Sequence, residues 1–143
     1  MEVIRKKHIG VYGVIIKEGN IALIKKACGG YKGKLDLPGG GMEYGENAFE
    51  TLKRELMEEA GLIVKDAKLF DILTTTIKWQ MTEEIIEDLY HIGILYNVNC
   101  FENELKKEPD NIDSLGANWY KISDLNKNKL TPFAKSVIEN YNK

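Results

Sequence analysis

Apolar residues in the first third of the chain alternate and cluster as strands require. Residues 8–17, which are rich in Val, Ile and Tyr, are predicted to form a strand, and residues 21–27 a second one. The polar turn Glu18-Gly19-Asn20 separates them, so we expect the two segments to form a hairpin. After a glycine-rich loop at residues 27–34, residues 35–37 read as a short strand that leads into the turn Pro38-Gly39-Gly40-Gly41.

Residues 47–60 have the pattern of a helix with one buried stripe. The apolar residues that recur at helical spacing are Phe49, Leu52, Leu56 and Ala60. Asn47 is followed three residues later by Glu50, which predicts a capping box at the start of the helix. Gly61 suits the left-handed position just past the helix end.

The second half of the chain contains further strand segments separated by polar connections. Residues 62–78 contain one or two strands, because residues 72–77 are β-branched and threonine-rich. Residues 89–98 predict a strong strand, and residues 117–122 a last one. We expect acidic connections at residues 80–88 and 99–114, the second of which is long for a compact domain.

A closing helix is predicted at the end of the sequence. Ser123-Asp124-Leu125 starts a helical turn, and Thr131-Pro132 supplies an N-cap with proline at the first helical position. The helix is expected to run to about Tyr141, and Phe133, Val137 and Tyr141 are expected to face the core.

The order of strands, helix, strands and helix predicts an α/β (α+β) fold with a mixed sheet. The 143 residues suit one domain, 1–143. A formal net charge of −2 and dispersed lysines give no general attraction to nucleic acid, so no stable nucleic-acid binding is expected. No apolar run approaches a membrane span or a signal peptide. The two cysteines, Cys28 and Cys100, do not make a disulfide framework, and we expect reduced thiols and a cytoplasmic location.

Three glutamates on the predicted helix are the main candidates for chemistry. Glu55, Glu58 and Glu59 lie at i, i+3 and i+4, so they share one sector of the helix surface beside the buried stripe. Like charges at this spacing repel one another, which a helix needing only solubility would avoid. Clustered carboxylates beside a glycine turn suit a hard divalent cation such as Mg²⁺. Arg54 is placed to pair with Glu50 and Glu58.

The wider pattern of fixed positions is much more specific than three acids alone. Gly40, Glu46, Arg54-Glu55-Leu56, Glu58-Glu59 and Gly61-Leu62 resemble the Nudix box, Gx5Ex7REUxEExGU, where U is an apolar residue. All fixed positions of the box, residues 40–62, match. The lead-in at residues 38–46 and the segment at residues 119–125 also resemble this MutT-like hydrolase family. The resemblance implies an α/β/α sandwich in which the box helix and the C-terminal helix flank the mixed sheet.

The resemblance also implies roles for individual residues. Glu55, Glu58 and Glu59 resemble the metal-binding glutamates of the family, and the carbonyl of Gly39 in the Gly39-Gly40 turn is a further expected ligand. Arg54 and Glu46 are expected to orient the catalytic helix and loop. The implied cofactor is Mg²⁺ or Mn²⁺, and the implied reaction is hydrolysis of a nucleoside diphosphate linked to another moiety X.

The general base stays open at the level of sequence. Either the box supplies it, or one of seven acids on later segments does: Glu83, Glu84, Glu87, Glu104, Glu108, Asp110 or Asp113. Structural roles are expected for His8 and His91, which lie in apolar strands without a sequence neighbour that forms a dyad. Core packing is expected for the aromatic residues that otherwise suit base stacking, Tyr12, Tyr31, Trp79 and Tyr90. Lys32 and Lys34 are expected to be solvated, and Cys28 has no neighbouring histidine to activate it.

Two other readings of the pattern remain. A non-catalytic nucleotide-binding sensor module is expected to have lost box residues, whereas this chain keeps all of them. An isomerase acting on a diphosphate is expected to show a supporting cysteine–glutamate pair, and none is apparent. The box does not specify X, so triphosphates, nucleotide sugars, ADP-ribose and dinucleoside polyphosphates all remain candidate small-molecule substrates. A homodimer paired through edge strands is also plausible.

Overall fold

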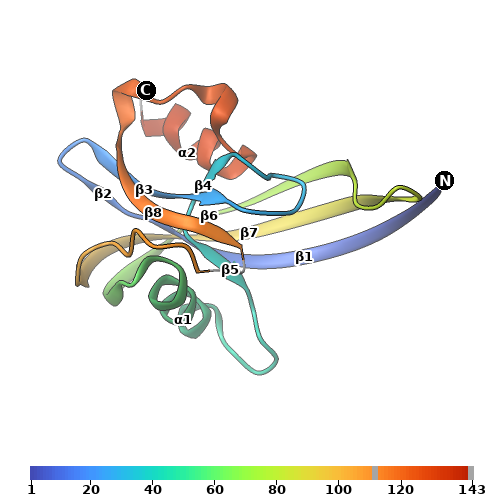
Figure 1. Ribbon diagram of the computed structural model, residues 1–143. Coiled ribbons are helices and arrows are strands. Elements are labelled where there is room, and N and C mark those ends of the chain that lie inside the picture. Colours follow the sequence, from blue (N-terminus) through green and yellow to red (C-terminus); the bar gives the residue numbers. More distant parts are fainter. Residues whose placement is uncertain (111–112, 142–143) are drawn as a thin grey trace.

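The computed structural model describes residues 1–110 and 113–141 and contains two sheets and two helices (Figure 1). The strands are β1 (Glu2–Val14), β2 (Ile16–Lys17), β3 (Asn20–Lys26), β4 (Leu35–Asp36), β5 (Gly39–Gly41), β6 (Ile63–Gln80), β7 (Ile85–Glu102) and β8 (Ser114–Lys121). The helices are α1 (Ala48–Ala60) and α2 (Pro132–Tyr141), and two single 3₁₀ turns, Ile122–Asp124 and Lys127–Lys129, lie before α2.

The first sheet is mixed and has the order β5-β1-β7-β6, with β1 and β7 parallel and the other pairs antiparallel. In the second sheet β3 pairs with β2, β4 and β8, all antiparallel. Helices α1 and α2 lie on opposite sides of these sheets (Figure 1). The predicted α/β/α sandwich is therefore confirmed.

Each helix has its own apolar core against the sheets. On the α1 side, Leu52, Leu56 and Ala60 pack with Val11, Ile24 and other strand residues. On the α2 side, Phe133 and Val137 pack with Leu23, Leu95 and their neighbours. Consecutive strand residues such as Leu23 and Ile24 serve opposite cores, because successive side chains of a strand point to opposite faces of the sheet.

The ends of α1 agree with the sequence prediction residue by residue. The side chain of Asn47 accepts a hydrogen bond from the backbone N–H of Glu50, and the Glu50 side chain accepts one from Asn47. Gly61 ends the helix with φ of 72°, and its N–H bonds to the carbonyls of Leu56 and Met57. These caps fix where α1 begins and ends relative to the glycine turn, and hence which glutamates reach that turn.

Several strand boundaries differ from the prediction. β1 already begins at Glu2, and residues 16–17 belong to the other sheet, so the predicted hairpin is formed by β2 with β3. Residues 62–78 lie mostly in one strand, β6, which continues to Gln80. The polar connection predicted at residues 80–88 is wrong at both ends. Gln80 is the last residue of β6, and β7 starts at Ile85, so only residues 81–84 connect the two strands. β7 also runs on to Glu102, and β8 starts at Ser114, so the predicted loop 99–114 is shorter.

Two aromatic residues expected in the core are exposed instead. Tyr141 is 49% exposed, because the buried stripe of α2 ends at Ile138 and Tyr141 is the last residue of the helix. Tyr90 is 42% exposed, and it points to the opposite face of β7 from its buried neighbour His91. Phe133 and Val137 are buried as predicted.

Candidate active site

The glutamates of α1 open onto a cavity of about 580 Å³. One wall consists of Gly39 and of residues from the box: Gly40, Gly41, Glu55, Glu58 and Glu59. The other wall comes from β1, β3 and the segment before β8: His8, Tyr12, Lys26, Lys106, Asp110 and Asp113. The cavity therefore joins the sequence-predicted helix to groups that lie far from it in the sequence.

Glu59 is the most unusual ionisable group in this cavity. Its side chain is only 4% exposed, and Oε1 accepts a hydrogen bond of 2.8 Å from the backbone N–H of Gly39. Burial raises the pKa of Glu59 to about 8, although the Gly39 N–H and Lys26 act in the opposite direction. A buried carboxyl group of this kind gains when a cation approaches, because the cation offsets the loss of hydration.

Glu55 and Glu58 lie further out on the same side of α1. Glu55 is half-buried, and burial raises its pKa while Arg54 opposes that shift. Glu58 is exposed, and its Oε2 lies 3.3 Å from Nη1 of Arg54. Within residues 1–110 and 113–141 no three His, Cys, Asp or Glu side chains already converge as a preformed metal site. The donor set nevertheless fits a hard cation, since it combines carboxylates with the Gly39 turn at one cavity wall.

Arg54 holds the loop that leads into α1. Its guanidinium binds both oxygens of Glu46, through Nε at 2.7 Å and Nη2 at 2.9 Å. Nη2 also donates to the carbonyl of Gly41 at 2.9 Å, and Nη1 donates to Glu55 at 2.8 Å. Hydrogen bonds from Arg54 and from the backbone N–H of Glu43 lower the pKa of Glu46 to about 2. Arg54, itself on α1, thus holds the loop through the bidentate pair with Glu46 and the glycine turn through the Gly41 carbonyl.

The predicted pairing of Arg54 with Glu50 is wrong. The Glu50 side chain is engaged at the N-terminus of α1, where it accepts from the backbone of Asn47. The predicted pairing with Glu58 is present. The capping box competes for Glu50, and it wins because it supplies a partner for a backbone donor that has none within the helix.

Glycine at position 39 is required by the backbone. Gly39 has φ of 149°, and a Cβ atom placed there would lie 2.1 Å from the carbonyl oxygen of Val11. This close approach lets β5 pair with β1 and directs the Gly39 N–H at Glu59. The glycine turn of the sequence is therefore a strand edge that presents its backbone to the cavity.

Of the seven distal acids, only Asp110 and Asp113 line the cavity that holds the box glutamates. Asp113 forms an ion pair with Lys26, and its Oδ1 accepts a hydrogen bond from the Cys28 thiol at 3.3 Å. Asp110 Oδ1 accepts the backbone N–H groups of Asp113 and Ser114, both at 2.9 Å, so it shapes this segment. Glu83 and Glu84 lie at the β6–β7 turn with exposed side chains, and Glu104 and Glu108 are also exposed. Glu87 lines a different cavity.

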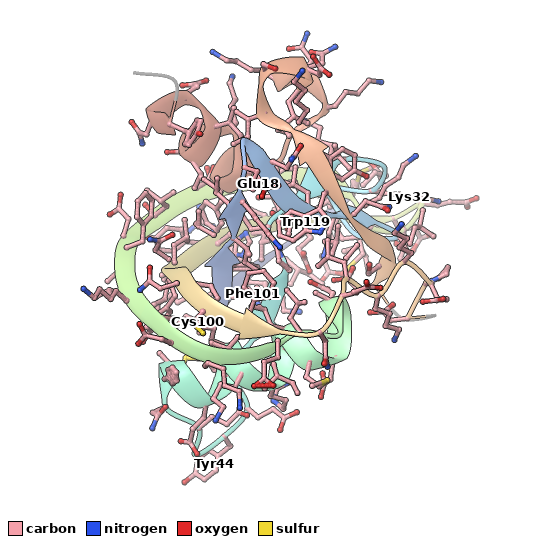
Figure 2. The ribbon with its side chains drawn as sticks, turned by 90° about the vertical axis from the view of Figure 1, so that its left-hand side faces the viewer. Glu18, Lys32, Tyr44, Cys100, Phe101 and Trp119 are labelled. Atoms are coloured by element: carbon pink, nitrogen blue, oxygen red, sulfur yellow. The ribbon has the colours of Figure 1, made fainter. Side chains whose placement is uncertain are left out.

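Lys26 is a site residue that the sequence analysis missed. Its partner Asp113 lies 87 positions away in the chain, so no local spacing reveals the pair. The nearby ion pair with Asp113 raises the pKa of Lys26, although burial by itself acts to lower it. Lys32 and Lys34, in contrast, are exposed as expected, and Figure 2 shows Lys32 at the periphery, away from the helix α1.

The histidines and the remaining aromatic residues divide between core and cavity. His91 is 5% exposed, and its Nε2 lies 2.7 Å from the Tyr12 hydroxyl, in agreement with the predicted structural role. His8 is half-buried and lines the cavity. Phe101 and Trp119 lie close together in Figure 2, with ring centroids 6.1 Å apart, on the α1 side of the sheets. Tyr44, at the tip of the loop before α1, projects into solvent (Figure 2).

A second cavity of about 290 Å³ adjoins the first. His8, Tyr12, Lys26 and Asp113 line both cavities. The second cavity is also lined by Trp79, Glu87, Tyr31 and His91, among others. The alternating pattern of β6 and β7 places Trp79 and Glu87 on one face, but no sequence signal brings the loop of Tyr31 over them.

None of the helices in the described part of the chain is long and apolar enough to cross a membrane. Neither Cys28 nor Cys100 takes part in a disulfide.

The sandwich, the glycine turn and the glutamate-bearing helix define a class of α/β domain with an acidic cavity at the helix surface. The family model of the NUDIX domain matches residues 6–141, so the chain belongs to the Nudix family. It is similar to a MutT NUDIX hydrolase from Burkholderia pseudomallei, with a TM-score of 0.76 and 25% identity over 94% of this chain and 97% of that one.

Two curated proteins are similar over part of their length. An ADP-ribose pyrophosphatase from Methanocaldococcus jannaschii is 40% identical over 67 residues, which are 47% of this chain and 40% of that protein. Putative nudix hydrolase 1 from Caenorhabditis elegans is 32% identical over 110 residues, 77% of this chain and 27% of that protein. The matched segments thus span less than half of either relative.

Proposed function

We propose that the protein is a metal-dependent pyrophosphohydrolase that cleaves a phosphoanhydride bond in a nucleoside diphosphate linked to a further moiety X. The nucleophile is water and the point of attack is phosphorus. The observation that carries this proposal is the buried Glu59, held by the Gly39 N–H in an acidic cavity of about 580 Å³. Membership of the Nudix family supports the same reaction class.

The residues that would hold Mg²⁺ or Mn²⁺ are Glu55, Glu58, Glu59 and the carbonyl of Gly39. A polyphosphate and a carboxylate cluster repel each other, so the cation supplies charge neutralisation and activation of water when it is bound. Arg54 and Glu46 position these groups, because the bidentate pair fixes the loop before α1 and Nη1 of Arg54 holds Glu55. Gly40 gives the Glu55 carboxylate its place, since a Cβ there would lie 2.5 Å from Oε2.

Asp113 is our candidate for the distal acid that acts on the water. Asp110 lies in the same cavity, but its Oδ1 accepts backbone N–H groups of its own segment, whereas the Asp113 carboxylate is held by the side chains of Lys26 and Cys28. Lys26 orients the Asp113 carboxylate and places a positive charge at the wall opposite the glutamates. A substrate phosphate entering the cavity would meet that ammonium group. The substrate is a small-molecule nucleotide, and we place the activity in the cytoplasm.

The test is product release from a panel of nucleoside triphosphates, nucleotide sugars, ADP-ribose and dinucleoside polyphosphates, with Mg²⁺ and with excess chelator. Glu59→Gln keeps the shape of the side chain and is expected to lower turnover by orders of magnitude. The matched control is Glu139→Gln on α2, which removes one carboxylate from the opposite layer and is expected to act as wild type.

Circular dichroism of all three proteins verifies that the fold is intact. Undiminished turnover in Glu59→Gln would remove Glu59 from the mechanism. Cleavage that persists in excess chelator would overturn metal dependence. Tight nucleotide binding without cleavage of any substrate would instead favour a non-catalytic sensor module.

A further inference from the structure

The second cavity has a size and a position that suit a flat, polar ring. Its volume of about 290 Å³ lies at the low end of ligand pockets, which matches one ring system better than a whole nucleotide. It adjoins the acidic cavity through His8, Tyr12, Lys26 and Asp113. A molecule with phosphates in the first cavity therefore has a direct route for its next group into the second.

Trp79 and Glu87 form the polar wall of this cavity. They are register partners on β6 and β7, and the indole Nε1 donates to Glu87 Oε1 at 3.0 Å. Glu87 is only 9% exposed, and no other hydrogen bond or ion pair reaches it from the described residues. A buried carboxylate has room for several donors, so one indole N–H leaves its acceptor capacity largely unused.

Two other residues that line this cavity each have a buried polar atom without a partner among the described residues, and one of them, His91, lies on the same face of β7 as Glu87. Tyr31 is 7% exposed and His91 is 5% exposed, and both line the cavity. The Tyr31 hydroxyl and the His91 Nδ1 have no hydrogen-bond partner among the described residues. Such atoms are uncommon in folded proteins, and they often mark places where a ligand or water completes the bonding.

We propose that this second cavity binds the base of the substrate nucleotide and selects guanine through Glu87. This inference rests on the proposed function, because it names the substrate class of that same site. Guanine presents two adjacent donors, N1–H and the 2-amino group, which match the acceptor oxygens of a carboxylate. The Trp79 indole keeps Glu87 in place and offers an aromatic surface at the cavity wall.

The other bases match this carboxylate less well. Adenine and cytosine each place a ring acceptor beside their amino group, and uracil flanks its single N–H with two carbonyls. An acceptor facing a carboxylate is repelled and leaves both groups unpaired. Hypoxanthine keeps N1–H but lacks the amino group, so its nucleotide should bind with intermediate strength. A carboxylate that reads a base edge discriminates by about tenfold or more.

The test measures binding of guanosine, inosine and adenosine monophosphates by saturation-transfer NMR in the presence of Mg²⁺. Wild type should bind the guanosine compound about tenfold tighter than the adenosine compound, with the inosine compound between them. Glu87→Gln replaces one acceptor by a donor and should abolish this order. Asp88→Asn is the matched control: Asp88 is the next residue of β7, outside both cavities, and pairs with Arg5 on the other face.

Equal binding of the three compounds by wild type, or no saturable binding of any, would overturn the proposal. Retention of the guanine preference in Glu87→Gln would also overturn it. The comparison of three ligands on wild type needs no variant, so misfolding cannot obscure the result. Selective guanine binding without phosphoanhydride cleavage would defeat only the proposed function, whereas cleavage without base selectivity would defeat only this inference.

Discussion

At the scale of single residues, His91 is held in its neutral form. Its ring packs against Phe133 with centroids 4.5 Å apart, and the His8 ring lies 5.3 Å away. Burial lowers the pKa of His91 from 6.5 to about 4, and the nearby His8 and Lys26 add to the effect. The unfolded chain binds a proton near pH 6.5 that the folded protein does not bind until about pH 4. Stability is therefore lost as the pH falls through this interval.

We expect the stability difference between wild type and His91→Gln to shrink by about 3 kcal/mol over that interval. Urea denaturation at a series of pH values measures it. The two proteins are compared with each other because Glu59 also contributes to the pH dependence of stability. Burial raises the pKa of Glu59 to about 8, so in the metal-free protein this residue makes stability rise as the pH falls, and it does so equally in both proteins. A difference that stays constant with pH would show that His91 is not held neutral.

At the scale of elements, the approach of β5 to β1 depends on Gly39. Alanine there meets the Val11 carbonyl oxygen at 2.1 Å, and both atoms belong to paired strands that cannot move apart cheaply. Gly39→Ala is expected to cost about 3 kcal/mol or more. Gly45→Ala is the matched control, since Gly45 also has a positive φ, 87°, but a Cβ meets nothing within 4 Å. It should cost about 1 kcal/mol.

Chemical denaturation of the three proteins compares these costs. Similar losses of unfolding free energy in both variants would mean that the backbone at position 39 shifts to accommodate the Cβ atom. Backbone strain, rather than the contact with β1, would then be the reason for glycine at position 39. The same experiment reports on the site, because the Gly39 N–H that bonds to Glu59 belongs to this strand edge.

Elements with local signals were predictable, and elements set by distant partners were not. Helix α1 carries its own caps at Asn47 and Gly61, so both ends followed from the sequence. The segment at residues 85–88 looked like a connection because it contains Glu87 and Asp88. It is strand because β1 pairs along it and because Trp79 supplies a donor for Glu87.

At the scale of the whole molecule, the candidate site consists of two groups of residues. One group comes from a single continuous segment, and the other is brought together from distant segments by the fold. The glutamates, Arg54 and the glycine turn come from one continuous stretch. Its pattern predicted the Arg54–Glu58 pair but not the bonds from Arg54 to Gly41 and Glu55. Lys26 and Asp113 meet across 87 positions, and the choice among seven distal acids required that contact. The second cavity needs β6, β7 and the loop before β4 together, so no single stretch predicts it.

Because the proposed ligands of the cation join β5 to α1, cation binding should stabilise the entire fold. A ligand at a hundredfold excess over its Kd adds about 2.7 kcal/mol. For a domain near this size, each kcal/mol shifts Tm by about 2–4 °C, so saturating Mg²⁺ should raise Tm by about 5–10 °C. Glu59→Gln should lose most of this shift, and Glu139→Gln should keep it. Thermal scans with Mg²⁺ and with chelator measure both. Equal Tm shifts in wild type and Glu59→Gln would mean that the cation does not bind at Glu59. The acidic cavity would then not be the site of the proposed metal-dependent hydrolysis.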